Sequence, residues 1–191
     1  MAPVRFSALL CSALLAACAG GSGSSPTGLL EATGLRKPPP VPEAQQPPRN
    51  VTVRLHAAKR LNVDTRGQSL ALLVRVYKLR QRTAFEQAPY AAFLTPQGER
   101  EALGADLIEV RELTLVPGQQ LELSEKLPRE VGWLGVVALF HSPPAKGWRL
   151  AFAAPDAEKT GMTIGLHACA MSADGTGNGS APTPLSLVRC Q

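Results

Sequence analysis

Short segments in which apolar and polar residues alternate dominate the chain after residue 50. In the first of them Val51, Val53 and Leu55 alternate with polar neighbours, the period-two pattern of a strand with one buried face. Turn-forming pairs such as Pro117-Gly118 separate the segments. The expected strands cover residues 51–56, 70–79, 107–115, 121–123, 133–140, 148–152, 162–168 and 185–190. This pattern predicts an all-β protein, an antiparallel β-sandwich of two sheets with about seven or eight strands.

One helical insertion is expected between the second and third strands. Thr83 followed three residues later by Glu86 is a capping-box pattern, and it predicts a short helix around Phe85. Pro89 limits this helix because proline has no backbone donor. Residues 99–103 fit a further helical turn.

The first residues of the chain predict export. Arg5 precedes an almost wholly apolar run over residues 6–17, which is long enough for a signal peptide and too short to span a bilayer. The run ends in Leu15-Ala16-Ala17-Cys18, which resembles the lipobox of bacterial lipoproteins. That resemblance implies cleavage before Cys18 and lipid on its thiol. The alternative is an ordinary secretory signal whose cleavage site precedes a cysteine.

The lipobox implies an anchor in the outer membrane, facing the periplasm. Ala19 stands where an aspartate would resemble an inner-membrane retention signal. The covalent lipid on Cys18 is the only non-protein group that we expect, with no cofactor besides.

Composition divides the chain into three parts. We expect a signal peptide over residues 1–17, a lipidated cysteine with a Gly/Ser/Pro-rich tether over 18–50, and the β-sandwich over 51–191. The formal net charge is +5, but the cations are scattered and no aromatic residues alternate with them. This distribution argues against a nucleic-acid partner.

Cysteine usage fits an oxidising compartment. Cys11 leaves with the signal peptide and Cys18 is lipidated, so Cys169 and Cys190 remain. We predict a disulfide between these two, with two free buried thiols as the alternative.

No set of residues indicates catalysis or metal binding. Outside the tether there is no Gly-x-Ser-x-Gly motif. His56, His141 and His167 lie far apart in sequence, and none has a second ligand at metal-binding spacing. We therefore expect no catalytic residue and no metal site, and a protein that is not an enzyme.

Several segments together resemble the TssJ (SciN-like) family of type VI secretion lipoproteins. They are Leu61-Asn62-Val63-Asp64, the strand Leu73-Val74-Arg75-Val76-Tyr77-Lys78-Leu79-Arg80, Leu103-Gly104-Ala105-Asp106, Ala138-Leu139-Phe140-His141 and Gly147-Trp148-Arg149. Val63 stands where the family commonly has proline, and Lys78 where it commonly has glutamine. The resemblance implies a transthyretin-like sandwich with an extra helix.

The resemblance also implies a function and a contact surface. Members of that family anchor the secretion membrane complex at the outer membrane by binding the periplasmic domain of the inner-membrane TssM (IcmF-like) protein. The loop between the first two strands is a contact surface there, and here it covers residues 57–67. The candidate partner-binding residues are Lys59, Arg60, Leu61, Asn62, Val63 and Asp64.

Two questions stay open on sequence alone. Leu61 fits either an interface anchor or the end of the sandwich core. A lipoprotein that carries a small periplasmic ligand is an alternative function, which would need an apolar pocket. A periplasmic hydrolase is a third reading, without a recognisable set of catalytic residues.

Overall fold

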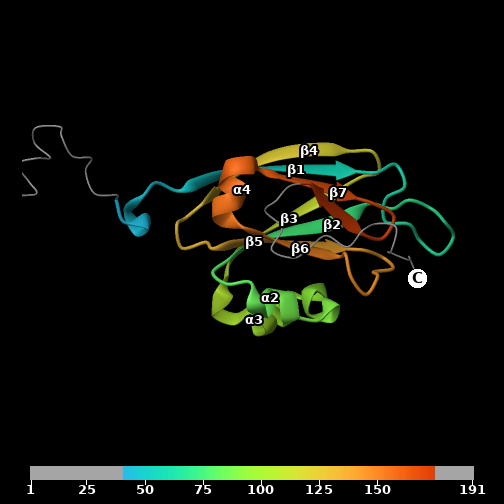
Figure 1. Cartoon of the computed structure of the whole chain (residues 1–191). Helices are drawn as coiled ribbons and strands as arrows, with labels where there is room; N and C mark the ends of the chain where they lie inside the picture. Colours follow the sequence, from blue (N-terminus) through green and yellow to red (C-terminus); the bar gives the residue numbers. More distant parts are fainter. Residues whose placement is uncertain (1–40, 175–191) are drawn as a thin grey trace, which may run out of the picture. The chain divides into compact units, whose positions relative to one another are not determined.

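The computed structural model describes residues 41–174, and these form a sandwich of two four-stranded sheets (Figure 1). Sheet 1 has the order β4-β1-β7-β8 and sheet 2 the order β3-β2-β5-β6. The strands are β1 (Arg49–Ala57), β2 (Leu72–Leu79), β3 (Leu107–Leu115), β4 (Gln120–Leu127), β5 (Trp133–Leu139), β6 (Arg149–Ala153), β7 (Met162–Leu166) and β8 (Met171–Asp174). The predicted all-β sandwich is confirmed.

One strand pair departs from the antiparallel pattern. β1 pairs with β4 in the antiparallel sense but with β7 in the parallel sense, where Val53 lies opposite Met162. The reason is the connection before β7. Helix α4 (Ala154–Thr160) carries the chain from β6 in sheet 2 to sheet 1, so β7 enters beside β1 in the same direction. Sheet 1 is therefore mixed.

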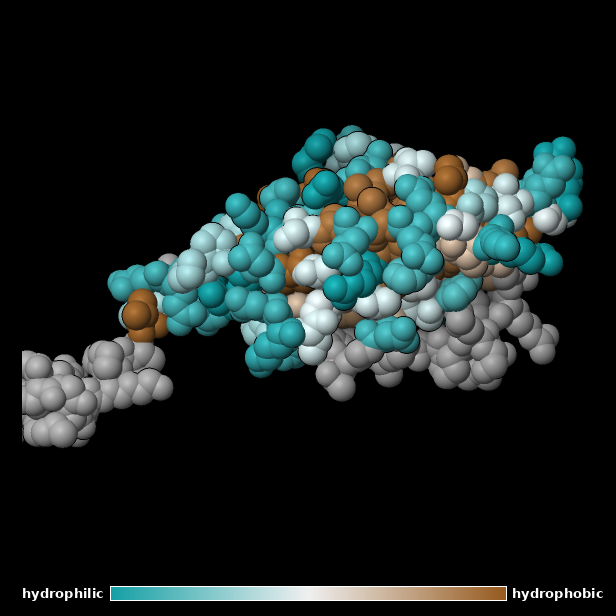
Figure 2. Space-filling model, turned by 90° about the horizontal axis from the view of Figure 1, so that it is seen from above, coloured by the Kyte–Doolittle hydropathy of each residue, from teal (hydrophilic) through white to brown (hydrophobic). Residues whose placement is uncertain are grey.

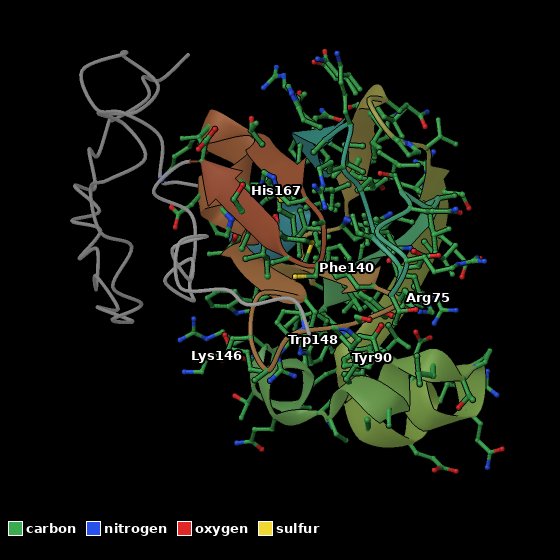
Figure 3. All side chains as sticks on the ribbon, turned by 90° about the vertical axis from the view of Figure 1, so that its right-hand side faces the viewer. Arg75, Tyr90, Phe140, Lys146, Trp148 and His167 are labelled. Carbon is green, nitrogen blue, oxygen red and sulfur yellow. The ribbon has the colours of Figure 1, made fainter. Side chains whose placement is uncertain are left out.

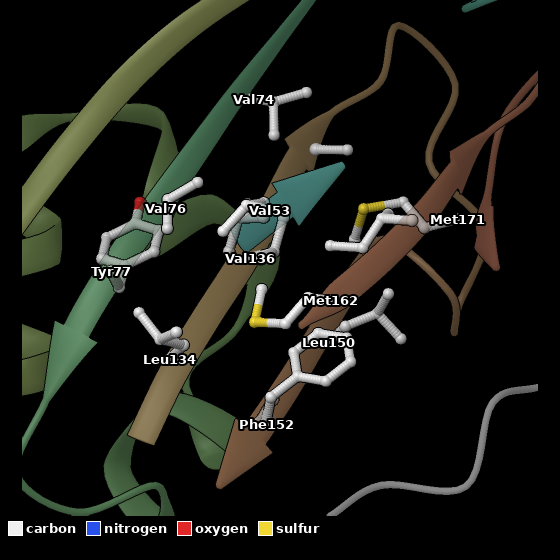
Figure 4. Packing of buried hydrophobic residues seen from close by; sticks show 14 of the residues in the cluster. Val53, Val74, Val76, Tyr77, Leu134, Val136, Leu150, Phe152, Met162 and Met171 are labelled. Atoms are coloured by element: carbon white, nitrogen blue, oxygen red, sulfur yellow. The ribbon is translucent and has the colours of Figure 1, made fainter. Parts of the chain in front are cut away.

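The core fills the space between the sheets. The apolar positions of the alternating pattern point inward, and the side chains of Val53, Val74, Val136 and Ile164 are fully buried. Figure 4 shows valine, leucine and methionine side chains from both sheets packed against one another. Each such side chain contributes about 1.5–3 kcal/mol on burial.

The helical insertion lies against the outer face of sheet 2. It consists of α2 (Thr83–Gln87), the 3-10 turn η2 (Tyr90–Leu94), α3 (Pro96–Leu103) and the 3-10 turn η3 (Gly104–Asp106). The rings of Phe85 and Phe93 pack on Tyr77 of β2, with centroids 5.5 and 5.7 Å away. Gly135 of β5 makes this approach possible, because a Cβ there would lie 2.7 Å from the Phe85 ring.

A buried carboxylate ties the insertion to the sheet. Glu99 of α3 accepts hydrogen bonds from the Tyr77 hydroxyl and, at 2.5 Å, from Arg75 Nη1. Burial raises the pKa of Tyr77, and the neighbouring Glu99 raises it further. The aromatic contacts and this polar cluster fix the insertion on one side of the sandwich.

Some local details differ from the sequence prediction. Thr83 is the first residue of α2 rather than its N-cap, and no side chain within residues 41–174 caps that helix. A true cap stands at Thr95, whose Oγ1 accepts from Gly98 N at 3.1 Å before α3. Helix α4 and strand β8 were not expected, and the strand predicted over residues 185–190 lies outside the described residues.

Within residues 41–174 no helix is long and apolar enough to cross a membrane. The same residues contain no group of three His, Cys, Asp or Glu side chains that could hold a metal ion.

Candidate functional site

Four loops meet at one end of the sandwich, which we call the loop end. Backbone hydrogen bonds join the chain that leaves β1 to the turn before β4: Ala57 N donates to Gln119 O at 2.8 Å, and Gly118 N donates to Ala58 O at 3.2 Å. Figure 3 looks onto this end. The loops are β1–β2 (residues 58–71), β3–β4 (116–119), β5–β6 (140–148) and β7–β8 (167–170).

Asn62 connects three of these loops. Its Nδ2 donates to Ala71 O, and its Oδ1 accepts from His141 N in the β5–β6 loop, both at 2.7 Å. Its backbone N donates to His167 O in the β7–β8 loop at 3.1 Å. Asn62 adopts a positive φ of 46°, which asparagine tolerates better than most residues. The loop end is therefore one hydrogen-bonded surface rather than four independent loops.

Asp64 shapes the exposed tip of the β1–β2 loop. Its Oδ1 accepts from Gln68 N at 2.8 Å and from Arg66 N at 2.9 Å. The hydrogen bond from Gln68 holds the pKa of Asp64 below its usual value, against the opposing effect of burial. Gly67 completes the turn at a positive φ of 80°. This turn presents Arg66, whose side chain is 77% exposed.

The predicted contact residues separate into two groups. Lys59 and Arg60 are exposed, and Val63 and Asp64 are half-buried. Leu61 is fully buried in the core cluster. The core alternative therefore holds for Leu61. Asn62 is also buried and holds the loops together, so neither of these two side chains is free to meet a partner.

The loop end carries an excess of positive charge. Its loops contain one carboxylate, Asp64, and four exposed cations. The cations are Lys59, Arg60, Arg66 and Lys146. Arg66 lies within the predicted contact loop but is not among the candidate residues. Lys146 has no sequence signal, because only the fold brings the β5–β6 loop beside the β1–β2 loop. Such a surface favours an acidic partner.

The β7–β8 loop contains a disulfide-bonded cysteine. Cys169 is 3% exposed and is disulfide-bonded, which rules out the alternative of a free thiol at this position. Its predicted partner, Cys190, lies outside the described residues.

The structure does not bring the three histidines together. His56 is exposed on β1 and His141 is exposed in the β5–β6 loop. His167 Nε2 lies 2.9 Å from Ser172 Oγ on β8, and burial lowers the pKa of its imidazole. Gly165 provides the room for this pair, since a Cβ there would lie 2.5 Å from Ser172 Oγ.

The chain enters the sandwich at the opposite end, which we call the tether end (Figure 1). The predicted tether boundary at residue 50 falls inside β1, and a 3-10 turn, η1 (Glu43–Gln45), precedes this strand. Arg49 is buried and forms ion pairs with Glu43 and, at 3.4 Å, with Glu158 of α4. Arg129 Nε donates to Pro47 O at 2.6 Å. The residues just before β1 are thus attached to the domain.

The solved structures similar to this chain share the two-sheet sandwich. The lipoprotein TssJ1 of Pseudomonas aeruginosa is 31% identical, with a TM-score of 0.60 over 72% of this chain and 100% of that one. A chain from a structure titled "Type VI membrane complex" is 25% identical, with a TM-score of 0.61 over 66% and 98%. A chain from the structure of the TssM C-terminal domain of EAEC is 22% identical, with a TM-score of 0.58 over 67% and 99%, and shows the fold alone.

The two-sheet sandwich with its helical insertion places this domain in the class of type VI secretion lipoprotein sandwiches. The sequence profile described as "Type VI secretion lipoprotein, VasD, EvfM, TssJ, VC_A0113" matches residues 49–169, more than half of the chain. The chain belongs to this family of type VI secretion lipoproteins, the TssJ (SciN-like) family. A comparison with curated protein sequences finds no match.

Proposed function

We propose that this protein anchors the type VI secretion membrane complex at the outer membrane by binding the periplasmic domain of the TssM (IcmF-like) protein. The loop end is the observation that supports this most. It is a hydrogen-bonded surface with four exposed cations and one carboxylate, the kind of surface that an acidic protein partner would recognise. A similar chain comes from a type VI membrane complex.

The anchor in this proposal is lipid on Cys18. The tether end receives the chain from the N-terminal side, while the loop end lies at the other end of the sandwich (Figure 1). A domain held at one end can therefore present the other end to a partner. Replacing Cys18 by serine is expected to move the protein from the membrane fraction to the soluble periplasm. Retention of this variant in the outer membrane would contradict the lipid anchor.

The partner surface can be tested by charge reversal. We expect the double variant Lys59→Glu and Arg66→Glu to reduce recovery of TssM from crosslinked envelopes about tenfold or more, because each cation would become a repulsive anion. Lys159→Glu is the matched control, since this lysine is 74% exposed on α4 at the tether end. Undiminished recovery with the double variant would refute the loop end as the binding surface.

The alternative function, a carrier of a small ligand, has less support. Side chains from both sheets fill the space between them (Figure 4). A β-sandwich that carries a ligand inside would need that space open.

A further inference from the structure

A pocket of about 520 Å³ lies at the margin of the loop end, between the start of the helical insertion and the β5–β6 loop. Gln87 and Tyr90 line it from the insertion, and Ala145, Trp148 and Arg149 line it from the β5–β6 side. Figure 3 shows Tyr90, Trp148 and Lys146 around this junction. Trp148 and Arg149 of the Gly147-Trp148-Arg149 motif therefore contribute to one wall of a pocket that the proposed function does not explain.

Arg149 is the chemically distinctive group in this pocket. Its guanidinium lies over the Trp148 ring, 4.7 Å from the centroid. Other cations that are withdrawn from solvent, half-buried Arg75 and buried Arg49, have carboxylate partners. Among residues 41–174, Arg149 has no carboxylate within ion-pair distance. Burial lowers its pKa, and Glu86 opposes this only through its charge.

A purely structural role explains only part of this arrangement. Arg149 Nη1 donates to Phe85 O at 2.9 Å and to Ala88 O at 2.5 Å, so it closes the end of α2. These bonds occupy one of the three guanidinium nitrogens. They leave Nε and Nη2, the fork of N–H groups that can bind a carboxylate side-on, without a hydrogen-bond partner among residues 41–174.

The pocket walls are already in place for a ligand. Tyr90 packs edge-on against Trp148, with ring centroids 5.0 Å apart, and its hydroxyl donates to Phe140 O at 2.9 Å. Pro143 and Pro144 restrict the β5–β6 wall. Little conformational entropy is lost when such a site is filled.

We propose that this pocket, the Arg149 pocket, binds an Asp or Glu side chain of the protein partner that docks on the loop end. The inference rests on the proposed function. Two observations select this occupant. The pocket continues the basic loop end, with Lys146 in the same loop, and His141 N of that loop is bonded to Asn62 Oδ1. The free guanidinium N–H groups, aromatic rings and proline walls match a carboxylate on an otherwise apolar segment.

Photocrosslinking in whole envelopes tests this in the full-length lipoprotein. A photoreactive amino acid is placed at Ala145, at the pocket rim, and separately at Arg66, on the loop tip. Lys159 at the tether end is the negative control position. We expect Ala145 and Arg66 to capture the same protein, and the peptide crosslinked at Ala145 to contain an Asp or Glu beside the crosslinked residue.

Two charge variants then test the role of the guanidinium. Ala145→Glu leaves the structural bonds of Arg149 intact but adds a competing carboxylate, and it should reduce capture at Arg66 about tenfold. Ala105→Glu, the same change at an exposed residue of η3, should leave capture unchanged. Arg149→Gln should also reduce capture, and its thermal unfolding shows whether the fold survives.

Each outcome separates the pocket from the proposed function. Capture at Arg66 without capture at Ala145, or equal effects of Ala145→Glu and Ala105→Glu, would overturn the Arg149 pocket and leave the proposed function standing. Capture at neither position would overturn both. A crosslink from Ala145 to another segment of the same chain would show that this segment, and not a partner, fills the pocket, and would refute the inference.

Discussion

Replacing Asn62 by alanine is expected to lower the free energy of unfolding by about 2–4 kcal/mol. The substitution leaves Ala71 O and His141 N without their 2.7 Å partners. Each unsatisfied group costs about 1–3 kcal/mol, toward the lower value where water can reach it. The positive φ of 46° adds about 1 kcal/mol, because alanine adopts the left-handed region less readily than asparagine.

A second variant separates the two contributions. Asn62→Gly loses the same hydrogen bonds but tolerates the positive φ, so we expect it to be about 1 kcal/mol more stable than Asn62→Ala. Asn50→Ala is the control, since Asn50 is exposed on β1 and surface substitutions change stability by about 0.5 kcal/mol or less.

Urea unfolding followed by tryptophan fluorescence measures these differences, since Trp133 and Trp148 lie in the folded domain. Each kcal/mol should also shift Tm by about 2–4 °C for a domain of this size. If the alanine and glycine variants were equal and both within about 0.5 kcal/mol of the unmodified protein, Asn62 would not hold the loop end together.

Three further predictions follow from buried groups. Arg75→Met should lower the free energy of unfolding in urea by about 3–5 kcal/mol, because it removes the cation beside buried Glu99. Arg54→Met, which breaks an exposed pair, should lower it by at most about 1 kcal/mol. Similar losses in the two variants would contradict this reasoning. Burial lowers the pKa of His167 from its usual 6.5, so its contribution to stability is present above pH 6.5 and is lost as the pH falls through the folded-state pKa. His167→Gln should make the free energy of unfolding depend less on pH in this range. An unchanged pH profile would show that His167 is not the group responsible. Reduction of the Cys169 disulfide should lower the unfolding free energy by about 3 kcal/mol, and nonreducing peptide mapping should join Cys169 to Cys190 rather than to another cysteine.

The fold could be predicted from sequence where the signal is local. Val51, Val53 and Leu55 alternate with polar neighbours, and the buried faces of β1 and β2 followed directly. Helix α4 had a local signal that was missed, since Pro155 stands at its start and Gly161 at its end. The four-residue strand β8 is too short to show a period.

The loop end could be predicted only in part. Lys59 and Arg60 were correctly placed in the β1–β2 loop, and both are exposed. The sequence left open whether Leu61 is core or interface. The burial of Asn62 could not be inferred, because two of its hydrogen-bond partners, His141 and His167, lie about 80 to 105 positions later in the chain. Lys146 and Arg149 join the surface for the same reason, through the sheet order rather than through any local pattern.

The path of β1 has a mechanical consequence. The chain enters this strand at Arg49, and the loop that follows Ala57 leads straight to the loop end. Any pull between a membrane anchor and a partner on that surface is therefore directed along the strand. β1 is bonded on both sides, to β4 and β7. The antiparallel bonds to β4 lie across the strand axis, and the parallel bonds to β7 are slanted to it. Force along β1 therefore loads both ladders in shear, so that many hydrogen bonds share it instead of opening one by one.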